Sequence, residues 1–110
     1  MEFNTIEEIV GDLQQGKIVV ILDNEDRENE GDVICAAEFA TTENVNFMAK
    51  YARGLICMPM SPEYTDKLHL PQMCITNTDN HCTAFSVSVD HVSTTTGISA
   101  EERGIAARKF

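Results

Sequence analysis

The 110-residue chain contains 43% hydrophobic and 24% charged residues, which fits one small folded domain and argues against a disordered segment. Its net charge of −10 argues against binding to nucleic acid or to an anionic membrane surface, since both need clustered Lys and Arg. No apolar run approaches the roughly 20 residues that span a bilayer, the N-terminus lacks the features of a signal peptide, and the four cysteines form no C-x-x-C pair. We therefore expect a cytoplasmic protein with reduced thiols.

The first third of the chain predicts a helix, a strand, an acidic segment and a second extended run. Residues 5–8, Thr-Ile-Glu-Glu, match a capping box, and apolar residues then follow at helical spacing as far as Gly16. Residues 18–22 are a continuous apolar run, mostly β-branched, which predicts a strand buried on both faces. The acidic segment, residues 23–32, follows this strand directly. Residues 33–37 then resume an apolar, extended run.

The middle of the chain predicts two more helices separated by a short strand. A cap at Thr41 or Thr42 opens a helix that ends at Gly54. Residues 55–58 form a short apolar strand. Pro62, at the first helical position, opens the next helix.

The last third predicts one strand and one helix. Residues 83–90 alternate between apolar and polar side chains, which predicts a half-exposed strand in an antiparallel pair. Residues 99–102, Ser-Ala-Glu-Glu, match a second capping box. The helix that it opens reaches Phe110 without a C-cap signal.

The acidic segment is the candidate functional site, since it carries six of the 18 acidic residues. In an extended chain, Asp26, Glu28, Glu30 and Asp32 would share one face at a spacing of about 6.5–7 Å. Neighbouring carboxylates would then repel by about 2.4 kcal/mol at an effective dielectric of 20. A cation would turn this repulsion into attraction, and oxygen ligands suit Mg²⁺, Ca²⁺ or Mn²⁺. Arg27, on the other face, could meet a phosphate.

Three other interpretations of these residues compete with a magnesium-type site. Charge runs are usually only solvated, although a loop directly after a buried strand is where α/β folds place ligand sites. An EF-hand fits poorly because Glu28 and Glu30 replace Asp or Asn, and Glu38 lies one residue beyond the closing position. A zinc site built from the Cys and His residues between positions 74 and 91 matches no standard spacing.

Residues 26–32, Asp-Arg-Glu-Asn-Glu-Gly-Asp, resemble the acidic motif of the 3,4-dihydroxy-2-butanone 4-phosphate synthase family of riboflavin biosynthesis. Residues 53–57 resemble the glycine-to-cysteine strand of that family, and residues 83–90 and 94–103 resemble its next two blocks. The resemblance implies an α/β (α+β) fold, in which a mixed β-sheet is sandwiched by helices. Residues 1–110 would be a single domain, the N-terminal part of the synthase domain.

The resemblance also implies an activity. Family members are Mg²⁺- or Mn²⁺-dependent lyases that convert D-ribulose 5-phosphate to 3,4-dihydroxy-2-butanone 4-phosphate and formate, and they form homodimers with active sites near the interface. Carried over by motif, Glu28 is a ligand of the metal and also contacts the substrate. By the same resemblance, Arg27 and Asp32 bind the substrate and Glu30 is the catalytic acid/base. This chemistry fits the motif, since enolisation of a sugar phosphate needs a base and a charge sink, which carboxylates and a metal ion supply.

Two further residues enter the site through the resemblance alone. Cys57 would line the site as a catalytic residue, and Thr96 would hold the phosphate of the substrate. Each has a simpler alternative, because a cysteine in an apolar strand is usually an inert thiol and Thr96 precedes a glycine in a turn.

The chain also departs from the family pattern. Family chains are about twice as long, and their second half carries Arg-Pro-Gly-His and Gly-His-Thr-Glu blocks that have no counterpart here. Ala106 also occupies a position where the pattern has Thr. We therefore expect a truncated domain with half of a composite site, inactive alone. The alternative is a non-catalytic acidic module that binds a metal or a partner.

Overall fold

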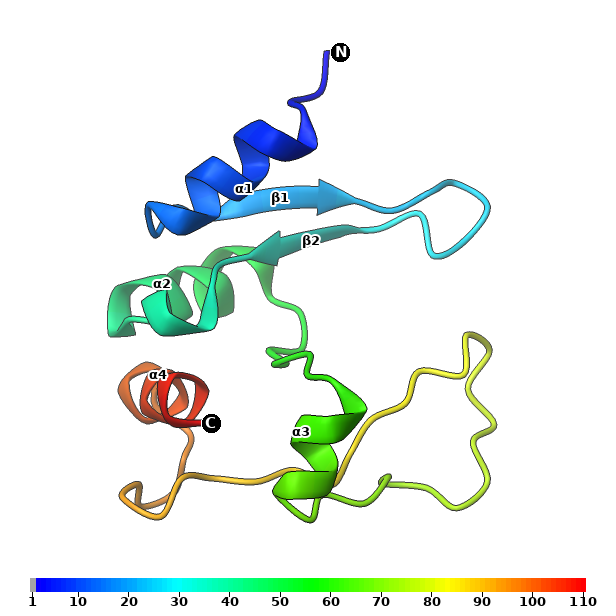
Figure 1. Cartoon of the computed structure of the whole chain (residues 1–110), viewed down its shortest axis with the longest axis vertical. Helices are drawn as coiled ribbons and strands as arrows, with labels where there is room; N and C mark the ends of the chain where they lie inside the picture. The colour runs from blue at the N-terminus through cyan, green and yellow to red at the C-terminus, as the bar shows by residue number, and fades with distance from the viewer. Residues whose placement is uncertain (1) are drawn as a thin grey trace.

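The computed structural model describes residues 2–110 and consists of helices arranged around a small antiparallel sheet (Figure 1). The elements in chain order are α1 (Ile6–Gln14), β1 (Val19–Leu22), β2 (Gly31–Ile34), the 3₁₀ turn η1 (Ala37–Phe39), α2 (Thr42–Phe47), its π-helical continuation η2 (Met48–Ala52), α3 (Pro62–Lys67) and α4 (Ala100–Lys109). All four predicted helices are present, and the two predicted strands around the acidic segment are β1 and β2.

Local cap signals decide where the helices begin. The Thr5 hydroxyl accepts from the backbone N–H of Glu8 at 3.3 Å, and the Glu8 carboxylate accepts from the N–H of Thr5 at 2.8 Å, so both halves of the predicted capping box form. Thr41 caps α2. The end of the second helix differs from prediction, because Arg53 and not Gly54 leaves the helix, with a left-handed φ of 60°.

Among residues 2–110 the sheet consists of β1 and β2, paired from Val19↔Ile34 to Leu22↔Gly31. The prediction that β1 is buried on both faces is wrong, since Val20 is 60% and Ile21 is 41% exposed.

The predicted mixed sheet is not formed by residues 2–110. Residues 55–58 are not a strand, and residues 83–90 make only one bridge, between Gln72 and Ser86. The Met73 N–H to Phe85 carbonyl hydrogen bond, 2.8 Å long, supports that antiparallel bridge. An extended segment becomes a strand only beside a ladder partner, and the described residues place no continuous partner beside these two segments.

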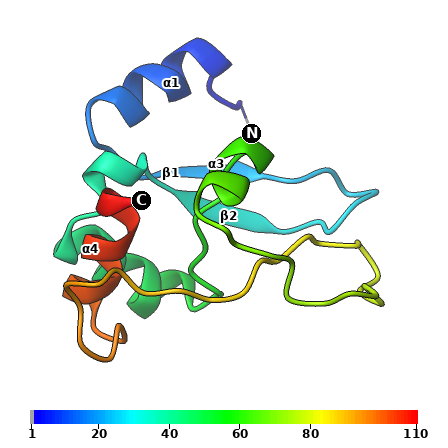
Figure 2. The same ribbon diagram turned by 60° about the horizontal axis from the view of Figure 1, so that its bottom comes forward.

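The buried centre lies between α2 and α4, which lie side by side in both views (Figures 1 and 2). Ala40 and Val45 are its buried apolar residues among the part of the chain described. Gly104 lets α4 approach closely, since a Cβ there would lie 2.5 Å from the Ala40 carbonyl oxygen. The Arg108 guanidinium donates to the same oxygen.

The molecule is less compact than its length predicts. Its radius of gyration is 15.1 Å, whereas a folded chain of this length is expected near 13 Å. None of the helices described is both long and apolar enough to cross a bilayer.

Candidate functional site

The acidic segment forms the loop of the β1–β2 hairpin, at the right-hand end of Figure 1. The N–H of Asp23 donates to the Glu30 carbonyl at 2.9 Å, which extends the strand pairing by one step. Beyond this bond the chain turns, and the N–H groups of Arg27 and Asn29 both donate to the Asn24 carbonyl. Asn29 has a φ of 53°, a conformation that Asn tolerates better than most residues. The loop is therefore a folded turn with defined side-chain positions.

Asp23 organises this loop through one carboxylate. It accepts from the N–H of Asn24 at 2.7 Å and from the N–H of Glu28 at 2.9 Å, and it pairs with the Nε of Arg27 at 2.8 Å. The N–H of Glu28, followed by the N–H of Asn24 and the Arg27 guanidinium, holds the pKa of Asp23 below its usual value. Asp23 thus positions both Arg27 and Glu28.

Arg27 lies among the carboxylates of the hairpin. Its Nη2 donates to Glu28 at 3.0 Å while its Nε contacts Asp23. The hydrogen bond to Asp23, and then the negative charges of Asp23, Glu28 and Asp32, hold the pKa of Arg27 above its usual value. The guanidinium therefore supplies a fixed positive charge at the hairpin, and its side chain remains 57% exposed.

The expectation of four carboxylates on one extended face is wrong. Residues 25–28 form a turn, so Asp26 and Glu28 do not continue the strand alternation. The repulsion calculated for an extended chain is relieved by this turn and by Arg27, which binds two carboxylates. Only Asp32 lies within a strand, opposite Ile21 in β2.

Asp32 also links the hairpin to Cys57, which lies in the extended segment after η2. The Cys57 Sγ donates to the Leu55 carbonyl at 3.4 Å. Partial burial of the sulfur, and then the charge of Asp32, raises the pKa of the Cys57 thiol. The raised pKa keeps Cys57 a neutral thiol near neutral pH. Since the thiolate is the reactive form, Cys57 can line a site without acting as a nucleophile.

Thr96 lies in a different loop, which is held by Glu102 of α4. The Glu102 carboxylate accepts from the N–H and hydroxyl of Thr95 at 2.6 and 2.8 Å and from the N–H of Gly97 at 2.8 Å. These bonds hold the pKa of Glu102 below its usual value, the N–H of Thr95 contributing most. Ser99 accepts from the N–H of Glu102 at 3.1 Å. The second predicted capping box is therefore only half formed, because its carboxylate binds the preceding loop.

The hairpin loop and the Thr96 loop lie at opposite ends of the molecule. The hairpin loop (cyan) and residues 92–98 (orange) are far apart in both views (Figures 1 and 2). The structure therefore pairs Arg27 with Glu28 directly and places the charge of Asp32 where it affects the pKa of Arg27 and of Cys57, but it does not place Thr96 beside them. Glu30 is exposed where the loop rejoins β2.

Comparison with known proteins identifies the family. The sequence profile of 3,4-dihydroxy-2-butanone 4-phosphate synthase matches residues 7–110. The chain belongs to this family. Riboflavin biosynthesis protein RibBA of Bacillus mycoides is 57% identical over 108 residues, which cover 98% of this chain and 27% of the relative.

Solved structures of the family give the same result. A 3,4-dihydroxy-2-butanone 4-phosphate synthase in complex with two magnesium ions is 50% identical, with a TM-score of 0.91 over 96% of this chain and 50% of that chain. The synthase of Candida albicans is 39% identical, with a TM-score of 0.82 over 98% of this chain and 53% of that chain. The chain thus spans about half of these solved chains and about a quarter of the curated relatives.

The hairpin offers the kind of donor atoms that bind a magnesium ion, but it does not gather enough of them to hold one. Carboxylate oxygens are the ligands that Mg²⁺ prefers. Among residues 2–110, however, no group of three or more His, Cys, Asp or Glu side chains is arranged to hold a metal ion. The Asp23 and Glu28 carboxylates are turned toward Arg27. Among the described residues, the hairpin thus offers carboxylate donors but no assembled metal site.

The sequence patterns do not identify two residues that position the loops. Asp23 belongs to the acidic segment, and its place directly after β1 is the available signal. Glu102 matches only a capping box, and no local pattern indicates that its carboxylate binds residues five and seven positions earlier.

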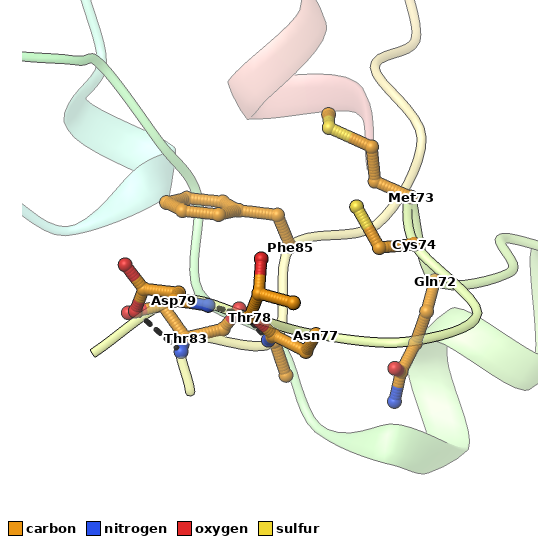
Figure 3. A pocket seen from close by; sticks show the side chains of 9 residues that line it. Gln72, Met73, Cys74, Asn77, Thr78, Asp79, Thr83 and Phe85 are labelled. Carbon is orange, nitrogen blue, oxygen red and sulfur yellow. Dashed lines mark hydrogen bonds between the residues drawn. The ribbon is translucent and has the colours of Figure 1, made fainter. Parts of the chain in front are cut away.

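A separate cleft of about 310 Å³ lies in the segment from Gln72 to Phe85 (Figure 3). Asp79 shapes this segment by accepting from the N–H groups of His81 and Thr83, each at 3.1 Å. None of the predicted site residues lines the cleft, so it is distinct from the hairpin.

Proposed function

We propose that this chain supplies the hairpin half of an active site that converts D-ribulose 5-phosphate to 3,4-dihydroxy-2-butanone 4-phosphate and formate, a lyase step of riboflavin biosynthesis. The observation that carries the proposal is the folded hairpin of a synthase-family chain, in which Asp23 fixes Arg27 beside Glu28. A guanidinium held between carboxylates, and still half exposed, suits a polyol phosphate that carries both hydroxyl groups and negative charge.

Each hairpin residue has a proposed task. Arg27 and Asp32 bind the substrate, Arg27 through its exposed N–H groups and Asp32 by accepting from hydroxyl groups. Glu30, exposed at the junction with β2, acts as the acid/base that removes a proton from the carbon beside the substrate carbonyl. Cys57 lines the site as a neutral thiol next to Asp32.

Glu28 is the proposed ligand of Mg²⁺ or Mn²⁺, and it also contacts the substrate. The metal supplies positive charge that stabilises the oxygen anion formed on enolisation. In the free chain Arg27 neutralises Glu28, so binding of a metal must compete with this ion pair.

The remaining proposals concern assembly and location. Thr96 holds the substrate phosphate. Because its loop lies far from the hairpin of the same chain (Figure 2), the complete site combines two copies in a homodimer, with Thr96 coming from one copy and the hairpin from the other. We propose a cytoplasmic location, where the sugar phosphate and reduced thiols are available.

Two measurements on the 110-residue chain test these assignments. Formate release from ribulose 5-phosphate should be absent, because the chain presents only part of a metal shell, and release by the purified chain would contradict the half-site assignment. Mg²⁺ titration should show weak binding, and Glu28→Gln should lower the affinity for Mg²⁺ at least tenfold. Glu25→Gln, in the same loop, is the matched control. Equal affinities for both variants would remove Glu28 from the metal site.

A second candidate function is a non-catalytic acidic module that binds a metal or a partner. The ion pairs of Arg27 with Asp23 and Glu28 favour it, because they stabilise the hairpin without any metal. Metal binding by the hairpin, combined with inactivity in a complete synthase domain, would support this alternative.

A further inference from the structure

Three consecutive threonines lie in the loop before α4, and their hydroxyl groups differ in their partners. The Thr94 hydroxyl donates to the His91 carbonyl at 2.7 Å, and the Thr95 hydroxyl donates to the Glu102 carboxylate at 2.8 Å. Thr96 is exposed, and its hydroxyl makes no hydrogen bond within residues 2–110. Of the three hydroxyl groups, that of Thr96 is therefore the one available to a ligand.

One carboxylate fixes the backbone on both sides of Thr96. The Oε1 atom of Glu102 accepts from the N–H of Thr95 at 2.6 Å, and its Oε2 atom accepts from the N–H of Gly97 at 2.8 Å. Both neighbours of Thr96 are thus held by a single side chain. The orientation of the Thr96 hydroxyl therefore depends on Glu102.

Glu102 is itself fixed by α4. It lies in the first turn of this helix, where its N–H donates to the Ser99 hydroxyl at 3.1 Å, and α4 packs against α2. The next residue, Arg103, holds the other end of the loop by donating from Nε to the Ile98 carbonyl at 3.0 Å. The positive end of the helix dipole and the N–H donors of the loop both offset the charge of the Glu102 carboxylate, which limits its repulsion of a nearby anion.

We propose that Glu102 is a positioning residue for recognition of the substrate phosphate and that it acts through Thr96. Because Glu102 occupies the N–H groups on either side of Thr96, the Thr96 hydroxyl is the donor that this part of the loop presents to a phosphate oxygen. A ligand contact of this kind is precise only when its neighbours hold it in place. The inference rests on the proposed role of Thr96 and adds the residue that supports it.

Glu102→Gln tests the positioning in the 110-residue chain itself. The amide oxygen of Gln can keep the contacts of Oε1 with Thr95, but its NH₂ group then faces the N–H of Gly97, donor against donor. The protection of the Gly97 amide from exchange should therefore fall at least tenfold, while that of Thr95 stays within threefold. Glu101→Gln is the matched control, since it removes the same charge from the first turn of α4, and it should change neither amide more than twofold.

Binding of ribulose 5-phosphate and of ribulose, followed by NMR at the amides of residues 95–97, tests the consequence for recognition. Glu102→Gln should raise the Kd for ribulose 5-phosphate at least fivefold and leave the Kd for ribulose, which has no phosphate, within twofold. A merely structural role would weaken the binding of both sugars alike. Glu101→Gln should leave both Kd values within twofold.

A double-mutant cycle shows whether Glu102 acts through Thr96. Thr96→Val removes the hydroxyl and should weaken ribulose 5-phosphate binding at least as much as Glu102→Gln. The double variant should bind within twofold of Thr96→Val, because the effects of coupled residues do not add.

The possible results separate this inference from the proposed function. If ribulose 5-phosphate leaves the amides of residues 95–97 unchanged in the unmodified chain, the proposed role of Thr96 is wrong, and this inference is overturned with it. Equal Kd values with and without Glu102→Gln, or a double variant weakened by the product of the two single effects, would overturn this inference alone. Thr95→Val removes only the hydroxyl contact with Glu102 and decides the question if Glu102→Gln does not fold; it should raise the Kd for ribulose 5-phosphate at least twofold, and an unchanged Kd would overturn the inference.

Discussion

Gly104 brings α4 against Ala40, which ends η1 just before α2, and alanine at position 104 should destabilise the chain. A Cβ at residue 104 would lie 2.5 Å from the Ala40 carbonyl oxygen, where an ordinary contact needs at least 3.4 Å. Helix α4 must therefore move outward by about 0.9 Å, because packed interiors hold little free space. Overpacking of this kind costs about 1–3 kcal/mol, while the helix propensity of alanine offsets about 1 kcal/mol.

The free energy of unfolding should fall by about 1 kcal/mol in Gly104→Ala, which lowers Tm by about 4–8 °C for a chain of this size. Gly11→Ala is the matched control, since Gly11 lies within α1 and a Cβ there would meet nothing within 4 Å. The control should gain about 1 kcal/mol from helix propensity. Thermal unfolding followed by far-ultraviolet circular dichroism measures both. A Gly104→Ala chain as stable as Gly11→Ala would refute the close packing of α4.

Three further predictions concern the Thr96 loop, Cys57 and the hairpin loop. Gly97→Ala should lose at least about 1–2 kcal/mol of unfolding free energy in urea, because Gly97 has a left-handed φ of 69° that penalises a Cβ. Asp32→Asn should lower the pKa of Cys57 and speed its alkylation. Peptide mass spectrometry resolves the alkylation of Cys57 from that of the other cysteines. An unchanged rate would show that Asp32 does not act on the thiol. The lowered pKa of Asp23 stabilises the loop above the unfolded pKa of about 3.9, and this contribution is lost as the pH falls through the folded pKa. The protection of the Glu28 amide, measured against the intrinsic exchange rate at each pH, should therefore be lost in Asp23→Asn at neutral pH, and in the unmodified chain only in acid. Equal protection of both at neutral pH would contradict the role of Asp23.

The elements that depend on short-range signals could be predicted from the sequence. The capping box of Thr5 and Glu8 needs only residues within one helical turn, and it forms as expected. The apolar runs on either side of the acidic segment likewise predicted the extended segments that become β1 and β2, although not their pairing. Residues 55–58 and 83–90 failed as strands because strand formation requires a neighbour, which no local pattern can reveal.

The site residues named from the motifs stay predictions, and their arrangement in space could not be predicted from the motifs. The turn of the acidic loop depends on the left-handed conformation of Asn29 and on the three contacts of Asp23, which the charge pattern alone does not specify. The position of Thr96 depends on the packing of α4 against α2 and on Glu102. These are contacts between distant parts of the fold, so the separation of Thr96 from the hairpin could not be anticipated.

The most direct test of the proposed function is a chimera in which these 110 residues replace the matching half of the magnesium-bound synthase. Release of formate from ribulose 5-phosphate in the presence of Mg²⁺ is the measurement. The chimera should release formate, and Glu30→Gln should slow it by at least about a hundredfold, as expected for loss of an acid/base residue. A folded chimera that releases no formate, or a Glu30→Gln variant with an unchanged rate, would contradict the proposal that this hairpin belongs to the active site.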